Sequence, residues 1–241
     1  MTVSVMSMGG LLNGRLVYRQ FSQGHRSGFE PVLMAAFVPA RAGDTVLEAG
    51  TGAGAALLCL AARVPGVRGI GVERAGPLAE LAAENFSSNG FAGLGAVNGD
   101  ATALPFAAHE FHHVMANPPW FGEETTPSPD AARALAHHAP ATMLEAWVGE
   151  LLRVLRDQGT ITLALPASAH AKAAALLRPA CGAITLLPLW PRPGAKAKLV
   201  LIRARKASRA PDTILPGLCL HGESGLTREA EQVLRDGGGL A

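Results

Sequence analysis

The stretch TVLEAGTGAGAALLCLAARVPGVRGIGVE, residues 45–73, decides the fold. It opens with a β-rich run from Thr45 to Ala49, turns through closely spaced glycines, and continues as an apolar, helix-forming run from Ala55 to Val64. A second β-rich run, Val67 to Glu73, ends the stretch. A strand, a helix and a second strand in this order predict two parallel strands of one sheet, joined by a helical crossover.

The same alternation continues toward the C-terminus. We expect further helices over 77–88, 141–156 and 168–177, and further strands over 95–98, 111–116 and 160–165. Two late β-rich runs, 183–189 and 197–205, have no helix between them. This pattern predicts an α/β fold with a doubly wound, mostly parallel sheet and an antiparallel C-terminal edge strand.

A different pattern precedes the first strand. Asn13-Gly14 lies between apolar residues, which is the strongest short-range signal for a hairpin. A helix is expected over 30–38, with Pro31 in its first turn and Pro39 after its end. We therefore expect a single domain over residues 1–241, in which 1–42 form a hairpin and helix extension.

Composition narrows the class of protein. The chain has 241 residues, 49% of them hydrophobic, and a formal net charge of +2, which suits one well-cored domain. Its 3 cysteines lack CxxC spacing, and the adjacent histidines at 112–113 and 137–138 have no partners at ligand spacing, so we expect no disulfide framework and no metal. We see no signal peptide and no apolar run that could span a bilayer, and we expect a cytoplasmic protein.

Positive charge gathers toward the C-terminal end. No acidic residue lies between Asp157 and Asp212, and the second half of that interval is rich in arginine and lysine. By itself this pattern also fits an ordinary solvated strand and loop. If the substrate is a nucleic acid, the residues expected to contact its phosphates are Lys196, Lys198, Arg203, Arg205 and Lys206.

The glycines after the first strand form a candidate ligand loop. In Glu48-x-Gly50-x-Gly52-x-Gly54, backbone N–H groups can approach a ligand closely at the start of a helix. The first two glycines, with Ala55, also fit a dinucleotide fingerprint, and Glu73 has the spacing of an acid that binds ribose hydroxyls. Glu48 favours a different ligand, because its charge suits the ammonium group of an amino acid and repels a pyrophosphate.

A second candidate loop, Asn117-Pro118-Pro119-Trp120, follows the run 111–116. An amino group conjugated to a ring or a carbonyl is a poor nucleophile, so a site that methylates it must accept its N–H hydrogen bonds and aim its nitrogen. The Asn117 side-chain oxygen and the Pro118 carbonyl are two such acceptors, and proline has no competing N–H. Trp120 offers a flat face on which a planar base can stack.

Together the two loops resemble the class I S-adenosylmethionine-dependent amino-methyltransferases that carry an Asn-Pro-Pro-aromatic motif. More narrowly, QFSQGHRSGFEPVL at 20–33 and SPDAARALAH at 128–137 are similar to the bacterial tRNA1(Val) adenine-37 N6-methyltransferase family, and the similarity extends to His221 and to 227–234. The resemblance implies a Rossmann-like class I sheet. It also implies S-adenosylmethionine over the glycine loop, and an adenine of RNA, most simply tRNA, held by the Asn-Pro-Pro segment.

The expected site follows from these motifs and from their positions after strands. The expected catalytic residues are Asn117, Pro118, Pro119 and Trp120. The cofactor is expected to contact Arg26, Glu48, Gly50, Thr51, Gly52, Gly54, Glu73, Arg74, Asp100, Ala101 and Asn117. Asp130 and Arg133 are expected to contact RNA together with the basic residues named above.

Other activities use a similar motif and stay open. A glutamine amide of a protein presents the same kind of conjugated amino group, although enzymes of that kind carry a helical N-terminal domain that about forty residues cannot supply. Guanine-N2 methylation of ribosomal RNA uses the same motif in chains with a longer N-terminal half. A different class is a nucleotide-binding or RNA-binding module without catalysis, against which intact Asn117 and Glu48 argue.

Overall fold

The computed structural model describes residues 6–22, 28–119 and 142–240. The helices in these ranges are α1 (Glu30–Phe37), α2 (Ala55–Arg63), α3 (Gly76–Ser88), α5 (Thr142–Val154), the short 3-10 helix η1 (Ala167–Ala169), α6 (His170–Leu177) and α7 (Arg228–Leu234). The strands are β1 (Met6–Leu11), β2 (Leu16–Phe21), β3 (Thr45–Ala49), β4 (Arg68–Glu73), β5 (Leu94–Asn98), β6 (Phe111–Ala116), β7 (Leu155–Pro166), β8 (Cys181–Trp190), β9 (Leu199–Lys206), β10 (Thr213–Ile214) and β11 (Leu218–Cys219).

The main sheet is doubly wound, as the sequence predicts. Its order is β10-β8-β9-β7-β6-β3-β4-β5, with β11 also paired to β8. From β3 the chain moves outward through β4 and β5, and it then returns to the other side of β3 to form β6. The order therefore reverses between β3 and β6, which is the switch point where such sheets bind ligands.

The predicted antiparallel strand is present, but the expected edge position is wrong. β9 runs antiparallel to both of its neighbours and lies between β7 and β8. The short strands β10 and β11, which pair with β8, occupy the outer side instead. In this position β9 pairs along both of its edges, which an edge strand cannot do. It also buries Leu201 and Ile202 on opposite faces of the sheet.

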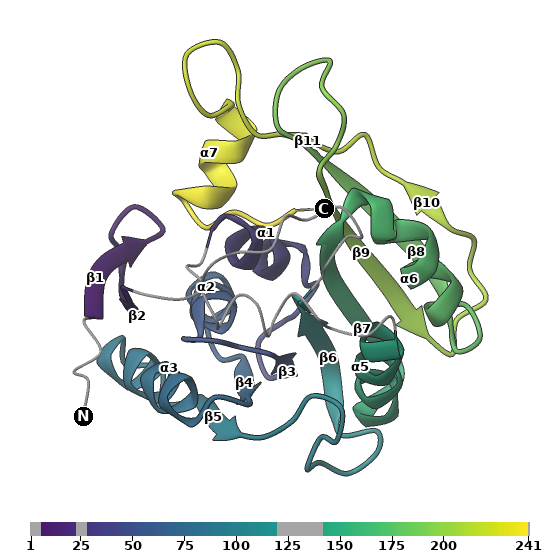
Figure 1. Ribbon diagram of the computed structural model, residues 1–241, viewed down its shortest axis with the longest axis horizontal. Helices are drawn as coiled ribbons and strands as arrows, with labels where there is room; N and C mark the ends of the chain where they lie inside the picture. The colour runs from purple at the N-terminus through teal and green to yellow at the C-terminus, as the bar shows by residue number, and fades with distance from the viewer. Residues whose placement is uncertain (1–5, 23–27, 120–141, 241) are drawn as a thin grey trace.

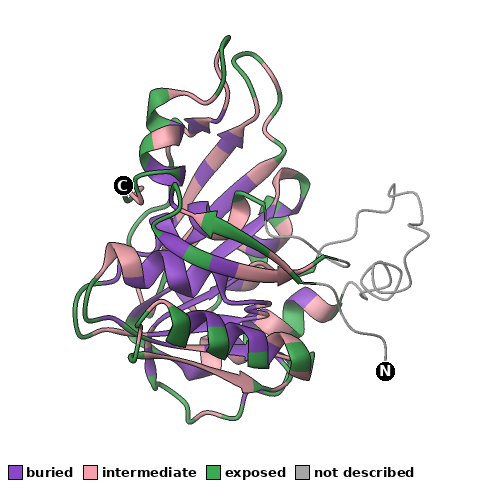
Figure 2. Cartoon of the chain, turned by 90° about the vertical axis from the view of Figure 1, so that its left-hand side faces the viewer, coloured by how far each residue is buried: buried purple, intermediate pink, exposed green. Residues whose placement is uncertain are grey.

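Helices cover both faces of the sheet (Figure 1). α1, α2, α3 and α7 pack on one face, around a core that includes Phe37, Leu57 and Phe86. α5 and α6 pack on the other face, around Leu151 and Ile161. Figure 2 shows that the buried residues concentrate in the sheet and on the inner sides of the helices. None of the helices in the described ranges is long and apolar enough to cross a membrane.

The predicted N-terminal hairpin is confirmed and is fixed to α3. β1 and β2 pair antiparallel around the Asn13-Gly14 turn. The Asn89 side chain accepts a hydrogen bond from Val17 N and donates one to Val17 O, at 2.9 and 2.8 Å. Asn85 makes the same pair of bonds with Arg19, at 3.0 and 2.9 Å. Two residues along a strand and four residues along a helix both advance roughly 6–7 Å, so Asn85 and Asn89 match the spacing of Arg19 and Val17. Their side-chain amides thus make the hydrogen bonds that a neighbouring strand would make to this edge of β2.

Candidate active site

The expected site loops meet at one edge of the sheet. The register pairs Ala49 with Ala116, so the chain leaves β3 and β6 side by side at Gly50 and Asn117. On the other side of β3, Ala49 pairs with Val72 of β4. The last residues of β4 and β5, Glu73 and Asn98, pair with each other. The glycine loop, Glu73, the 99–106 segment and Asn117 therefore follow neighbouring strand ends.

The glycine loop is a tight turn that leaves space on one side. Gly50, Gly52 and Gly54 have φ values of 69°, 56° and 87°, in the left-handed region that favours glycine. A Cβ atom on Gly54 would lie 2.5 Å from the Phe86 ring, and one on Gly50 would lie 2.7 Å from Trp147. A Cβ on Gly52 would meet no atom within 4 Å. Gly54 and Gly50 are thus needed for packing, whereas open space beside Gly52 fits a bound cofactor.

Glu48 is a buried carboxyl group directly below this loop. Only 4% of its surface is exposed, and its Oε2 accepts a hydrogen bond from Thr51 Oγ1 at 2.7 Å. Burial raises the pKa of Glu48 to about 8, above the range of an ordinary carboxyl. A buried acid of this kind fits a cationic ligand group, which would offset the desolvation of the charge. Thr51, expected to contact the cofactor, directs its hydroxyl to Glu48.

Glu73 and Asp100 are acids that follow the next two strands. Glu73 accepts hydrogen bonds from Gly52 N at 3.0 Å and from Ala75 N at 2.9 Å, which fix its carboxylate beside the glycine loop. A carboxylate has further lone pairs for hydroxyl groups. Asp100 Oδ1 accepts from the amide and the hydroxyl of Thr102, and these bonds lower the pKa of Asp100. Nearby Arg74 contributes to the same shift, and both side chains are exposed.

Asn117 and the prolines follow β6 as predicted. Asn117 is partly exposed, Pro118 is buried and Pro119 is exposed. Trp120, Arg26, Asp130 and Arg133 lie outside the described residues, so their expected roles stay predictions.

The basic residues of the C-terminal third divide between the two edges of the sheet. Because β8 runs parallel to β7, the loop between β8 and β9 lies at the same edge as Asn117. Lys196 and Lys198, on this loop, are exposed. Arg205 is exposed near the opposite edge, where its Nη1 donates to Gln158 O at 3.1 Å. Of the residues expected to contact phosphates, Lys196 and Lys198 thus lie at the edge of the sheet where the glycine loop leaves β3.

Arg203 and Lys206 have structural partners in the described residues, and their expected contact with phosphates stays a prediction. Arg203 Nη1 donates to Phe37 O at 2.9 Å, and the guanidinium lies 4.2 Å from the centre of the Phe37 ring. Lys206 Nζ donates to Leu152 O and Leu155 O, both at 2.6 Å. The last carbonyls of a helix lack partners inside the helix and carry a partial negative charge. Arg203 satisfies such a carbonyl at the end of α1, and Lys206 satisfies one at the end of α5 and also the carbonyl of Leu155, the first residue of β7.

The adjacent histidines of β6 bind a carboxylate at the other edge of the sheet. His113 Nε2 lies 3.1 Å from Asp44 Oδ2, and His112 Nε2 lies 3.7 Å from Asp44 Oδ1. His113 Nδ1 lies 2.8 Å from Thr160 Oγ1. Within the described ranges, no group of three or more histidine, cysteine, aspartate or glutamate side chains could hold a metal ion.

One cavity among the described residues lies away from the glycine loop. Its volume is about 660 Å³, and its lining includes Arg15, Arg68 and Phe91. Arg68 starts β4, so this cavity opens at the edge opposite Asn117. The strand ends and the polar side chains, which carry the chemistry, locate the candidate site instead.

Several residues that support the site carry no motif in the sequence. Asn85, which is fully buried, donates to Ala53 O in the glycine loop at 2.9 Å. Trp147 packs against Gly50, and the ion pair Glu150–Arg153 binds the segment after Asp100. The three-residue spacing of Glu150 and Arg153 on a predicted helix could predict the ion pair. It could not predict that the pair binds the backbone of the 104–106 segment.

Comparisons with known proteins agree with this architecture. The family model described as a methyltransferase domain matches residues 46–159. The tRNA1(Val) (adenine(37)-N6)-methyltransferase of Proteus mirabilis is 26% identical over 178 residues, 65% of either chain. The protein of the same name from Actinobacillus succinogenes is 32% identical over 143 residues, 58% of this chain and 60% of its own length. The matched region thus spans less than two thirds of these relatives.

A solved structure extends the likeness over most of the chain. It is described as a predicted O-methyltransferase from Agrobacterium tumefaciens, with a TM-score of 0.73 and 22% identity. The alignment covers 88% of this chain and 98% of that one, which shows a shared fold. The chain therefore has the class I methyltransferase fold and resembles the tRNA1(Val) adenine-N6-methyltransferases.

Proposed function

We propose that this protein is an S-adenosylmethionine-dependent methyltransferase that acts on the exocyclic N6 amine of an adenine in RNA, at position 37 of a valine tRNA. The observation that carries the proposal is the register of β3 and β6, which brings the glycine loop and Asn117-Pro118 out of the sheet side by side. A donor loop and an amine-binding loop must be neighbours for a direct transfer. The names of the relatives support tRNA as the substrate.

The donor site in this proposal uses the residues around the glycine loop. Glu48 faces the ammonium end of the donor, the backbone at Gly52 lies against it, Glu73 accepts from the ribose hydroxyls and Asp100 accepts from the adenine amino group. Thr51 donates a hydrogen bond to Glu48, and the charge of Arg74 acts on Asp100. When bound, S-adenosylmethionine supplies an electrophilic methyl group on a sulfonium. Arg26 and Ala101 are further proposed contacts of the donor.

The acceptor site uses the segment after β6. The Asn117 side-chain oxygen and the Pro118 carbonyl accept the two N–H groups of the target amine, which orients its lone pair. Trp120 stacks on the base. The nitrogen gains the methyl group and loses a proton to solvent, so the chain needs no covalent intermediate. Lys196 and Lys198, at the same edge, contact RNA phosphates. Asp130 and Arg133 are further proposed contacts with RNA.

The substrate is tested on cellular RNA. Nucleosides from purified tRNA of cells with and without the gene are compared by mass spectrometry, and tritiated-methyl transfer by the purified protein is measured in parallel. We expect N6-methyladenosine at position 37 of a valine tRNA to disappear without the gene. An unchanged level would direct the search to guanine in ribosomal RNA or to glutamine in a protein. Donor binding without transfer to any of these substrates would leave a non-catalytic binding module.

The role of Asn117 has a separate test. Asn117→Ala removes an acceptor for the target amine and leaves the donor loop intact, so turnover is expected to fall by roughly 10²–10³-fold while donor binding persists. Transfer kinetics and calorimetry measure the two quantities. A parallel loss of donor binding would contradict the role given to Asn117.

A further inference from the structure

α5 contacts two of the loops that form the proposed donor site. Early in the helix, Trp147 lies against Gly50 in the glycine loop. One and two turns later, Glu150 and Arg153 bind the 104–106 segment, which follows Asp100. Residues three apart on a helix share a face. One face of α5 therefore spans the distance between the glycine loop and the loop that carries Asp100.

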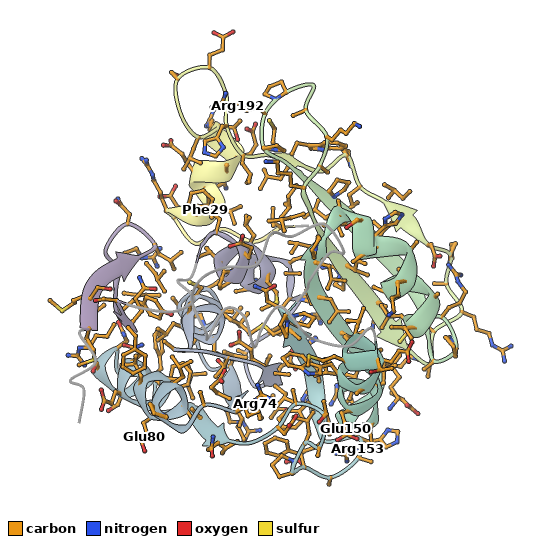
Figure 3. All side chains as sticks on the ribbon, in the orientation of Figure 1. Phe29, Arg74, Glu80, Glu150, Arg153 and Arg192 are labelled. Carbon is orange, nitrogen blue, oxygen red and sulfur yellow. The ribbon has the colours of Figure 1, made fainter. Side chains whose placement is uncertain are left out.

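The Glu150–Arg153 pair holds backbone groups as well as its own charges. Arg153 Nε and Nη2 donate to the two oxygens of Glu150 at 2.9 and 2.8 Å, and Figure 3 shows these side chains together on α5. Leu104 N donates to Glu150 Oε2, while Arg153 donates to Leu104 O and Phe106 O, each at 2.8 Å. The guanidinium fork thus serves a carboxylate and two carbonyls at once.

The remainder of this loop is fixed from the sheet side. Gly99 N donates to Glu73 O at 3.0 Å, and Phe106 packs edge-on against Phe111 with ring centres 5.2 Å apart. Between these points Ala101 and Leu104 are buried, while Asp100 is exposed. The loop that carries Asp100 is therefore held by the sheet at Gly99 and Phe106 and by α5 at Leu104 and Phe106, so its distance from the glycine loop depends on both.

We propose that Glu150, Arg153 and Trp147 are positioning residues that set donor affinity by fixing the spacing between the glycine loop and the Asp100 loop. The proposal rests on the proposed function in one respect, that the adenosine part of the donor lies between these loops. It assigns α5 no contact with the donor and no part in aiming the target amine. Loss of the pair is therefore expected to change donor binding and to leave the methyl transfer step unaltered.

The sharpest test is the double variant E150R/R153E. It keeps the net charge and the opposite-charge pair on the helix, but position 150 can no longer accept from Leu104 N and position 153 can no longer donate to the carbonyls. We expect the Kd for S-adenosylhomocysteine by calorimetry and the donor KM to rise about tenfold. The kcat at saturating donor and the KM for tRNA are expected to stay within about twofold, and amides 101–106 to exchange hydrogen faster.

A matched control is the pair Glu231–Arg235 on α7, which also lies on a helix surface with an N–O distance of 2.8 Å. E231R/R235E is expected to leave the donor Kd unchanged. If E150R/R153E proves too unstable to assay, Arg153→Lys, which keeps one donor group, and Trp147→Phe, which keeps a smaller ring, are expected to give intermediate affinities.

Two results would overturn the proposal. One is an unchanged Kd in E150R/R153E, and the other is a fall in kcat with the donor KM unaltered. The two proposals can fail separately, because calorimetry needs no RNA. A wild-type protein that binds the donor without methylating tRNA would refute the proposed function, and the effect of E150R/R153E on the donor Kd could still be measured.

Discussion

At the scale of single residues, the proposed role of Glu48 predicts that donor binding depends on pH. Burial raises the pKa of its carboxyl from 4.5 to about 8, so the donor-free native state keeps a proton that the unfolded chain has lost. At this group the native state therefore binds more protons between these values, and the contribution of Glu48 to stability falls as pH rises from 4.5 to about 8. A donor ammonium group favours the charged carboxylate, so donor binding near neutral pH should release a proton.

Glu48→Gln tests this coupling. The variant cannot lose a proton, so its Tm without donor should exceed that of the wild type by a margin that grows up to about pH 8 and then levels off. Its donor Kd should rise at least about tenfold, because the ammonium loses its charged partner. Thermal unfolding at several pH values gives the first result, and calorimetry in buffers of different ionisation heats gives the second. A constant Tm difference across this range would show that Glu48 is already ionised.

At the scale of elements, the hairpin and α3 form a unit held by side-chain amides. Asn85 is fully buried, and its loss would leave the N–H and C=O groups of Arg19 and the carbonyl of Ala53 without partners. Asn85→Ala should lower the free energy of unfolding by about 1–3 kcal/mol. Urea unfolding measures the change. Asn89→Ala is the control, because Val17 is exposed and water can replace its bonds, and an equal loss in both variants would be contrary to expectation.

Among the elements, the boundaries of two central strands could be predicted from the sequence. The bounds of β3 and β6 agree with the predicted runs, because short buried strands that end in glycine or proline have clear local signals. The glycine and Asn-Pro-Pro loops follow these strands for the same reason. β7 starts earlier than predicted, at Leu155, because pairing with Phe111 extends it beyond its apolar run.

What the sequence could not predict depends on contacts between distant segments. The insertion of β9 between β7 and β8, and the roles of Arg203 and Lys206 at two helix ends, have no local pattern. From sequence alone, a lysine or arginine is expected to be a solvated surface charge, because the carbonyl that it binds lies in a distant segment. The short β10, β11 and α7 gave equally little signal, since two-residue strands are defined only by the strand beside them.

At the scale of the whole molecule, the edge of the sheet opposite the candidate site is sensitive to acid. Burial lowers the pKa of His113 and of His112, so the native state holds fewer protons on them than the unfolded chain does below about pH 6.5. Burial alone would raise the pKa of Asp44, but hydrogen bonds from Arg41 N and His113 outweigh it, and the net pKa is lowered. All three groups therefore stabilise the fold at neutral pH and lose that contribution as pH falls.

His113→Asn tests this acid sensitivity. The variant should be less stable than the wild type at pH 7, because the bonds to Asp44 and Thr160 are lost. Its Tm should also fall less between pH 7 and pH 5 than that of the wild type, since one group that gains a proton on unfolding has been removed. An equal fall of Tm with pH in the two proteins over this range would refute the acid sensitivity assigned to His113. Comparing the two proteins at each pH cancels the contribution of Glu48.

The interior position of β9 bears on how the protein is made. Translation proceeds from the N-terminus, so Leu155–Pro166 and Cys181–Trp190 leave the ribosome before Leu199–Lys206, the segment that separates them in the sheet. During that interval the nascent polypeptide presents two open strand edges, which can pair wrongly with each other or recruit chaperones. Closure of the sheet is thus a late event in biosynthesis, although the half of the molecule that carries the candidate site has already been synthesised.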